Sequence, residues 1–242
     1  MINRNLSKRV KGNTLPKFIT LLLLVLISNL VSAQNAEDKL GSWYIYNGFY
    51  NFSPKFELFF DTQYRSFEPI TNAQRFLVRP YFNYNFTSNA QAGLGLEYHK
   101  FWSYDEVPEN KLSAEEFRIT LQGILSQKVS RVGFQHRYRY EFQNIGDARL
   151  QRMRYRLQAT VPLNNSSLEK GTFFLDSYFE IFISTSTQFS FNQNWAYGAV
   201  GYQLTDQINL QLGYLAVIQQ VRTLSRLQFF FTHKLRFYDR ME

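Results

Sequence analysis

Residues 130–161 read SRVGFQHRYRYEFQNIGDARLQRMRYRLQATV, and apolar side chains alternate with charged or polar ones on both sides of Gly146 and Asp147. In the first half, aromatic and aliphatic residues hold the even positions from Val132 to Phe142; in the second half they hold the odd positions from Met153 to Val161. Successive side chains of a β-strand point to opposite faces, so the pattern predicts a hairpin with one apolar face and one face dense in arginine. Each arm has about a dozen residues, which is long enough to cross a bilayer at a tilt.

Similar alternation recurs along the rest of the chain, in eleven segments with little sequence between them. The segments are residues 42–52, 55–67, 74–86, 90–102, 114–127, the two arms of 130–161, 171–184, 191–204, 207–219 and 224–237. Phe and Tyr make up 40 of the 242 residues, although the mean hydropathy is negative. This combination is typical of transmembrane barrels, because polar residues occupy every second position and aromatic girdles lie at the interfaces. We therefore predict an all-β fold, an antiparallel transmembrane β-barrel of 10 to 12 strands.

The number of segments conflicts with the even strand number of single-chain bacterial barrels. Short turns alternate with longer loops, of which the polar connection 103–113 is the longest. Bacterial barrels have their short turns on the periplasmic side. The last segment is therefore expected to end in the periplasm, and the first segment to start on the outside. A mature N-terminus on the outside is unusual. Either segment 42–52 leaves the wall and the barrel has ten strands, or one strand has been missed and the barrel has twelve. Twelve is favoured, because 42–52 adjoins the next segment through Ser53 and Pro54. Pro80 predicts a bulge or weak pairing in segment 74–86.

The first 33 residues resemble a secretory signal. A basic leader with five Lys and Arg residues precedes an apolar run at 18–31 and a small-residue cleavage site at Ser32 and Ala33. The predicted organisation is a signal peptide at 1–33, a short N-terminal extension at 34–41, a barrel at 42–238 and a tail at 239–242. A cleaved signal and a barrel together predict the outer membrane as the location.

Removal of the signal also removes most of the positive charge. The whole chain has 27 Lys and Arg against 19 Asp and Glu. Without the five basic residues of the leader, 22 basic residues face 19 acidic ones, a net charge of +3. The sequence therefore gives no support to a nucleic-acid partner. The expected partners are outer-membrane lipid, the barrel assembly machinery and, as candidate solutes, small anions.

Several stretches carry a family resemblance: HRYRYE at 136–141, RMRYRLQ at 152–158, Glu180 and QNWAYGAVGYQL at 193–204. They resemble an uncharacterised family of Gram-negative outer-membrane barrels, known as domain of unknown function 2490. Segment 224–237 is also similar to the C-terminal strand that outer-membrane proteins present to the barrel assembly machinery. The resemblance implies the fold and the location, but no activity. The family commonly has an arginine where this chain has Trp195, so no family ligand is carried over to that position.

Charged residues are expected to line the barrel interior, since Arg or Lys facing lipid at mid-bilayer costs roughly 2 to 4 kcal/mol. A turn at Gly146 and Asp147 sets Arg139 opposite Arg154, Arg137 opposite Arg156 and Glu141 opposite Arg152. A turn near residues 166 and 167 would set Asp176 opposite Arg156 and Glu180 opposite Arg152. The predicted luminal charge lattice is Arg137, Arg139, Glu141, Arg152, Arg154, Arg156, Asp176 and Glu180. Further luminal charges are predicted at Glu57, Asp61, Arg65, Arg75, Arg79, Glu97, Glu116 and Arg118.

Two interpretations of this lattice remain open. A narrow barrel can fill its interior with mutually satisfied charges and serve as a structural or accessory barrel. Alternatively, the arginines outnumber the nearby acids and form a basic constriction that favours anions, which would make the protein a narrow passive channel. The first interpretation is favoured, because so few strands leave little room. A third candidate role is that of the barrel subunit of an envelope complex, and the sequence offers no residues that identify a partner.

An enzyme is not expected. Some outer-membrane barrels are lipid hydrolases or acyltransferases with a Ser and His pair, and His99 with Ser103 is the best such pair here. No nucleophile motif surrounds Ser103, and His136 and His233 fall on the outward parity. The chain lacks Cys, its histidines are far apart and its carboxylates are scattered, so neither a metal site nor a cofactor is predicted.

Overall fold

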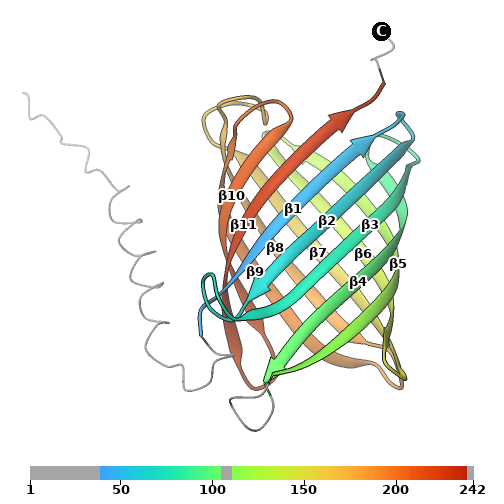
Figure 1. The fold of residues 1–242 in the computed structure, drawn as a ribbon. Coiled ribbons are helices and arrows are strands. Elements are labelled where there is room, and N and C mark those ends of the chain that lie inside the picture. Colours follow the sequence, from blue (N-terminus) through green and yellow to red (C-terminus); the bar gives the residue numbers. More distant parts are fainter. Residues whose placement is uncertain (1–38, 105–110, 239–242) are drawn as a thin grey trace, which may run out of the picture. The chain divides into compact units, whose positions relative to one another are not determined.

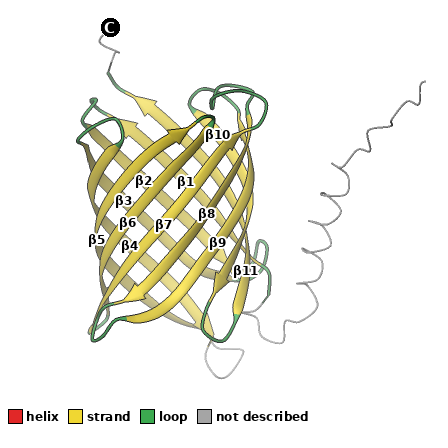
Figure 2. Ribbon diagram, turned by 180° about the vertical axis from the view of Figure 1, so that it is seen from behind, coloured by secondary structure: helices red, strands yellow, loops and turns green. Residues whose placement is uncertain are grey.

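The computed structural model describes residues 39–104 and 111–238, and in this part of the chain a closed β-barrel accounts for all regular structure. The expected signal peptide and C-terminal tail lie outside the described residues. The strands are β1 (Gly41–Asn51), β2 (Phe56–Ser66), β3 (Ala73–Asn85), β4 (Ala90–Tyr104), β5 (Lys111–Val129), β6 (Val132–Ile145), β7 (Ala148–Pro162), β8 (Phe173–Ser184), β9 (Ser190–Gln203), β10 (Ile208–Ile218) and β11 (Thr223–Arg236). The all-β barrel that the alternating pattern predicts is confirmed (Figures 1 and 2).

Consecutive strands pair antiparallel around the wall, and the barrel is closed by a parallel pair, β1 with β11. Gly41 lies opposite Arg226 and Asn51 opposite Arg236, so the first and last strands run in the same direction side by side (Figure 1). We call the end at which β1 starts the Gly41 mouth and the end at which β11 finishes the Arg236 mouth.

The eleven described strands lie within the predicted range of 10 to 12 but match neither even number. The expectation that one segment leaves the wall, or that one strand is missing, is wrong in detail because all eleven segments are in the wall. An antiparallel closure needs an even strand number, whereas the parallel closure accepts an odd one. The start of β1 therefore stays at the mouth opposite to the end of β11.

Two further details differ from the sequence-based expectation or refine it. The predicted connection 103–113 is shorter, because β4 extends to Tyr104 and β5 starts at Lys111, and these two residues pair with each other. Pro80 interrupts the ladder to β4 as predicted: Val78 pairs with Tyr98 and Tyr81 with Gly95, with no pairs between them. The register is the same on both sides, so the interruption is a gap in pairing and not a bulge.

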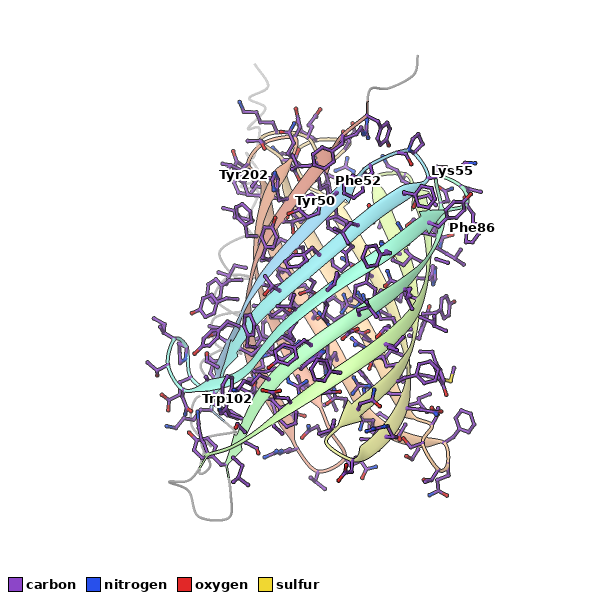
Figure 3. The ribbon with its side chains drawn as sticks, turned by 45° about the vertical axis from the view of Figure 1, so that its right-hand side comes forward. Tyr50, Phe52, Lys55, Phe86, Trp102 and Tyr202 are labelled. Atoms are coloured by element: carbon purple, nitrogen blue, oxygen red, sulfur yellow. The ribbon has the colours of Figure 1, made fainter. Side chains whose placement is uncertain are left out.

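The two faces of the wall differ in chemistry along most strands. On β5 the residues Glu116, Arg118, Thr120 and Gln122 are buried, and each residue between them is exposed. The exposed members are Phe117, Ile119 and Leu121, which are about half exposed. The charged parity therefore faces the interior, and the outer face is apolar, as Figure 3 shows in the ring of side chains outside the ribbon.

Inward-facing glycines make room for interior aromatic rings. A Cβ at Gly95 would lie 2.4 Å from the Tyr81 ring, and a Cβ at Gly201 would lie 2.2 Å from the ring of Phe174. In each case the glycine and the aromatic residue face each other on adjacent strands. The rings lie over the bare backbone, so the interior can hold large side chains inside a narrow wall.

We expect Gly201→Val to destabilise the barrel by about 1 to 3 kcal/mol, since the new side chain must displace the buried ring of Phe174. Gly198→Val is the matched control: it lies on the same strand, faces outward, and its Cβ would meet nothing within 4 Å. Urea unfolding in detergent micelles, followed by tryptophan fluorescence, measures the difference. Equal midpoints for the two variants would contradict the proposed packing.

Candidate functional site in the barrel interior

The interior is divided into a charged half and an apolar half. Strands β2 to β8 carry the predicted charges, whereas β8 to β11 and β1 contribute a buried cluster of aromatic and aliphatic side chains. Trp43 and Trp195 meet edge to face in this cluster, with 5.3 Å between ring centroids. The two halves meet where arginines stack on these rings.

Glu141 binds three arginines at the centre of the charged half. Its carboxylate, which is fully buried, accepts hydrogen bonds from Arg152 at 2.6 Å, from Arg154 at 2.6 Å and from Arg118 at 3.4 Å. These four residues belong to β5, β6 and β7, so one carboxylate ties three strands together. Charge-assisted bonds of this kind are about twice as strong as neutral ones.

Glu180 binds a second group of three arginines. The fully buried carboxylate lies 2.9 Å from Arg154, 2.7 Å from Arg156 and 3.1 Å from Arg137. Arg154 therefore bridges Glu141 and Glu180, and its guanidinium also lies 4.3 Å from the centroid of the Phe182 ring. The two carboxylates and their arginines form one connected network across β5 to β8.

A second group of charges lies on β2 to β5. Arg118 also pairs with Glu116, which accepts from Arg75 at 3.3 Å, and Arg79 pairs with Asp61 on the neighbouring strand. Glu97 accepts hydrogen bonds from Tyr81, from Thr120 at 2.7 Å and shares one with His99 at 2.9 Å. Glu57 accepts from Asn83 and Gln91, each at 3.1 Å.

The register of the central hairpin matches the sequence-based prediction. Arg139 lies opposite Arg154, Arg137 opposite Arg156 and Glu141 opposite Arg152. The reason is local: two residues, Gly146 with φ of 55° and Asp147, connect the strands and fix the pairing on both sides.

The predicted register between β7 and β8 is wrong. Glu180 lies opposite Arg156, not Arg152, and Asp176 lies opposite Thr160, not Arg156. The connection has ten residues, and its turn lies later than predicted. In it, Thr172 donates its backbone N–H to the Glu169 carbonyl, next to Gly171 with φ of 85°. Asp176 consequently accepts from Thr160 and Gln158 and forms no ion pair with the residues that the structure describes.

Two interior arginines have aromatic and amide partners in place of carboxylates. Arg139 donates to Gln122 at 3.1 Å and lies 4.4 Å from the Tyr81 ring centroid. Arg65 donates to Gln63 at 2.7 Å and lies 3.6 Å from the Trp43 ring centroid. Cation–π contacts of this kind stabilise desolvated guanidinium groups. They also leave the positive charge uncompensated, so the interior is basic.

All sixteen predicted luminal residues lie on the inward parity of their strands. With Arg226, ten arginines with buried or half-buried side chains face seven carboxylates inside the described barrel. The arginines are Arg65, Arg75, Arg79, Arg118, Arg137, Arg139, Arg152, Arg154, Arg156 and Arg226, and the carboxylates are Glu57, Asp61, Glu97, Glu116, Glu141, Asp176 and Glu180.

The sequence-based prediction missed the apolar half of the interior. It includes Trp43, Tyr178, Phe182, Trp195 and Leu215, all buried. A signal for β8 was present: Asp176 and Glu180 were predicted to face inward, and Phe174, Tyr178 and Phe182 share their parity. Arg226 was also missed, although it alternates with Leu227 and Phe229 in a segment with the same two-residue period.

Three cavities lie inside the described barrel. A cavity of about 290 Å³ opens at the Gly41 mouth, one of about 190 Å³ lies at the Arg236 mouth, and a small one of about 60 Å³ lies between them. Trp43, Arg65, Arg79, Arg154 and Trp195 line both the first cavity and the small one. These side chains fill most of the middle of the barrel and leave only the small cavity of about 60 Å³ there.

A lipid-hydrolase site at His99 and Ser103 is not supported by the geometry. Both residues line the cavity at the Gly41 mouth, but His99 is buried, and its ring nitrogens already have partners: Nε2 bonds Glu97 at 2.9 Å and Nδ1 lies 3.2 Å from Arg75. A histidine with both nitrogens engaged has no free position for a serine proton. Among the described residues, no cluster of three or more His, Asp or Glu side chains could hold a metal ion, and no helix is long and apolar enough to cross a membrane.

The geometry defines a closed β-barrel with a salt-bridged, partly aromatic interior. The chain belongs to the family described as Protein of unknown function (DUF2490), whose model matches residues 40–228. No curated protein matches the chain, and neither does any solved structure. The match covers β1 to β10 and the start of β11, so it includes the whole charged half of the interior.

We expect Glu180→Gln to destabilise the barrel by about 3 to 5 kcal/mol, because three buried guanidinium groups lose their shared carboxylate. Asp176→Asn is the matched control on the same face of β8, because an amide oxygen can still accept from Gln158 and Thr160. Its expected cost is below about 1 kcal/mol. Urea unfolding measures both, and equal losses would contradict the central role of Glu180.

Proposed function

We propose that this protein is an outer-membrane β-barrel whose interior is closed by side chains, and that it serves as a structural or accessory barrel, not as an open diffusion pore. The observation that carries the proposal is the filled middle of the barrel, where the cavity between the two mouths measures about 60 Å³. The family gives no activity that would argue for another role.

The outer face supports a location in the membrane. Phe82 is 58% exposed, Phe117 57% and Val200 52%, and similar apolar residues cover most strands. Soluble monomers rarely expose contiguous apolar patches above a few hundred Å². Tyr50, Phe52, Phe86 and Tyr202 lie toward the Arg236 mouth and Trp102 toward the Gly41 mouth (Figure 3), as aromatic girdles at two interfaces would. The basic and apolar leader of the sequence agrees with export.

Closure of the interior follows from the network. A solute that crosses the middle must move Arg154, which lies between Glu141 and Glu180 and against two aromatic rings. Breaking one side of a buried charge network leaves unpaired charges and costs about 3 to 5 kcal/mol. The barrel is therefore stable in its closed form.

A narrow anion-selective channel is the second candidate. The interior has ten arginines and seven carboxylates, and this excess of positive charge favours an anion channel over a cation channel. A brief displacement of the central arginines would open a path lined by positive charge. We do not propose an enzyme. The described residues give no specific support to a role as a subunit of an envelope complex.

We expect the purified protein to give no conductance steps in a planar bilayer. The double variant Phe59→Ala and Tyr178→Ala removes two side chains that line the small central cavity together with Arg154, which widens the passage beside this arginine. It should therefore produce steps, which also proves that the barrel inserts. Steps from the unaltered protein would contradict the closed barrel, and an anion preference of those steps would favour the second candidate.

We expect the protein to fractionate with the outer membrane and to migrate faster on a gel before heating than after heating, as folded barrels do. Detergent-free extraction into the soluble fraction would contradict the proposed location. This test does not depend on the state of the interior, so it separates location from closure.

A further inference from the structure

We propose that the cavity at the Gly41 mouth is a binding site for a small organic anion that carries an apolar group, such as an aromatic or short-chain carboxylate. Among the residues that the structure describes, eight arginines and no carboxylate line this cavity of about 290 Å³, and aromatic side chains complete its wall. The inference goes beyond a closed barrel, because it concerns one mouth and not the passage.

Arg65 is the primary anion-binding group. It is half-buried and stacks 3.6 Å from the Trp43 ring centroid, and in the described chain it has no carboxylate within ion-pairing distance. Its guanidinium is held in place by Gln63 through two hydrogen bonds to the same oxygen, at 2.7 and 2.9 Å. A fixed guanidinium with unused donors is suited to a carboxylate, which it can bind through two parallel hydrogen bonds.

Two indole N–H groups next to Arg65 support the assignment. Trp43 and Trp195 are 4% and 9% exposed, both line the cavity, and neither indole nitrogen has a hydrogen-bond partner. A buried donor without a partner is costly, and a ligand or a water molecule in the adjoining cavity could satisfy it. An oxyanion beside Arg65 would be close to both rings.

The charge of the wall selects an anion over a neutral ligand. Arg75, Arg118 and Arg152 line the cavity, whereas their carboxylate partners Glu116 and Glu141 do not. Among the described residues, the charged groups at the cavity wall are therefore guanidinium groups. Such a cleft concentrates anions from solution.

Apolar side chains of the same cavity select the apolar part of the ligand. Phe182, Val217 and Leu224 line the cavity together with the two tryptophan rings, and all three are buried. Inorganic phosphate would leave this surface without a contact, whereas an aromatic ring would pack against it. The volume lies at the lower end of the range for ligand pockets, which limits the ligand to about the size of one ring with its carboxylate.

Titration of the purified, detergent-solubilised protein with benzoate, followed by tryptophan fluorescence and calorimetry, tests the proposal. We expect saturable binding of one benzoate, weaker binding of inorganic phosphate and none of benzyl alcohol, which has the same ring without the charge. Arg65→Gln should weaken benzoate binding about tenfold or more. Trp43→Phe and Trp195→Phe, which keep the ring and remove the N–H, should each weaken it several-fold.

Arg149→Gln is the matched control for lost charge, because Arg149 is exposed at the same mouth, donates to the Gly146 carbonyl and does not line the cavity. Its benzoate affinity should equal that of the unaltered protein. Gel migration before and after heating shows that each variant is folded. Arg65→Lys should bind with intermediate affinity, since it keeps the charge but loses the second donor.

Four results would overturn the proposal: no saturable benzoate binding at about 10 mM, equal binding of benzoate and benzyl alcohol, tighter binding of phosphate than of benzoate, or an unchanged benzoate affinity in folded Arg65→Gln. None of them bears on conductance or location. A failure of this site is therefore distinguishable from a failure of the proposed closed barrel.

Discussion

The bridging of Glu141 and Glu180 by Arg154 is the interaction on which the interior depends. Each carboxylate is fully buried and holds three guanidinium groups, and Arg154 belongs to both sets. Burying so many charges is unfavourable unless every one has a partner. The positions of β5 to β8 are therefore coupled: moving one strand separates charges on the others. This coupling gives the narrow barrel one defined interior.

The apolar half of the interior explains why so much arginine can be accommodated. Guanidinium groups are weakly hydrated and stack on aromatic rings, so Arg65 on Trp43 and Arg156 on Tyr178 keep their charge without a full set of carboxylates. Lysines at these positions would lose the stacking. The aromatic rings also fill the space that a ring of charges alone would leave to water, and the glycines beneath Tyr81 and Phe174 let them do so.

The predictability of the fold varies with the range of the interaction. Strand positions and the inward parity follow from the two-residue period, and the hairpin register follows from the tight turn at Gly146. The β7–β8 register depends on where the turn falls within a ten-residue loop, and no single residue in that loop fixes it. Strand number was misjudged because the pairing of β1 with β11 joins segments that are far apart in sequence.

The predictability of the candidate site follows the same division. Charged residues could be assigned to the interior because facing lipid is costly for them. Trp43 gave no such signal, since its neighbour Tyr44 is equally suited to either face. The unpaired indole groups depend on packing between β1 and β9, which no local pattern reports. Sequence alone therefore identified the charged half of the interior and not the cavity that combines both halves.

The parallel closure has a consequence for topology. In an even-stranded barrel the first strand starts and the last strand ends at the same mouth, whereas here β1 starts at the Gly41 mouth and β11 ends at the Arg236 mouth. In the proposed outer-membrane location, Gly41 and Arg236 would therefore lie on opposite sides of the membrane in either orientation of the barrel. The wall of strands would thus connect the two sides covalently.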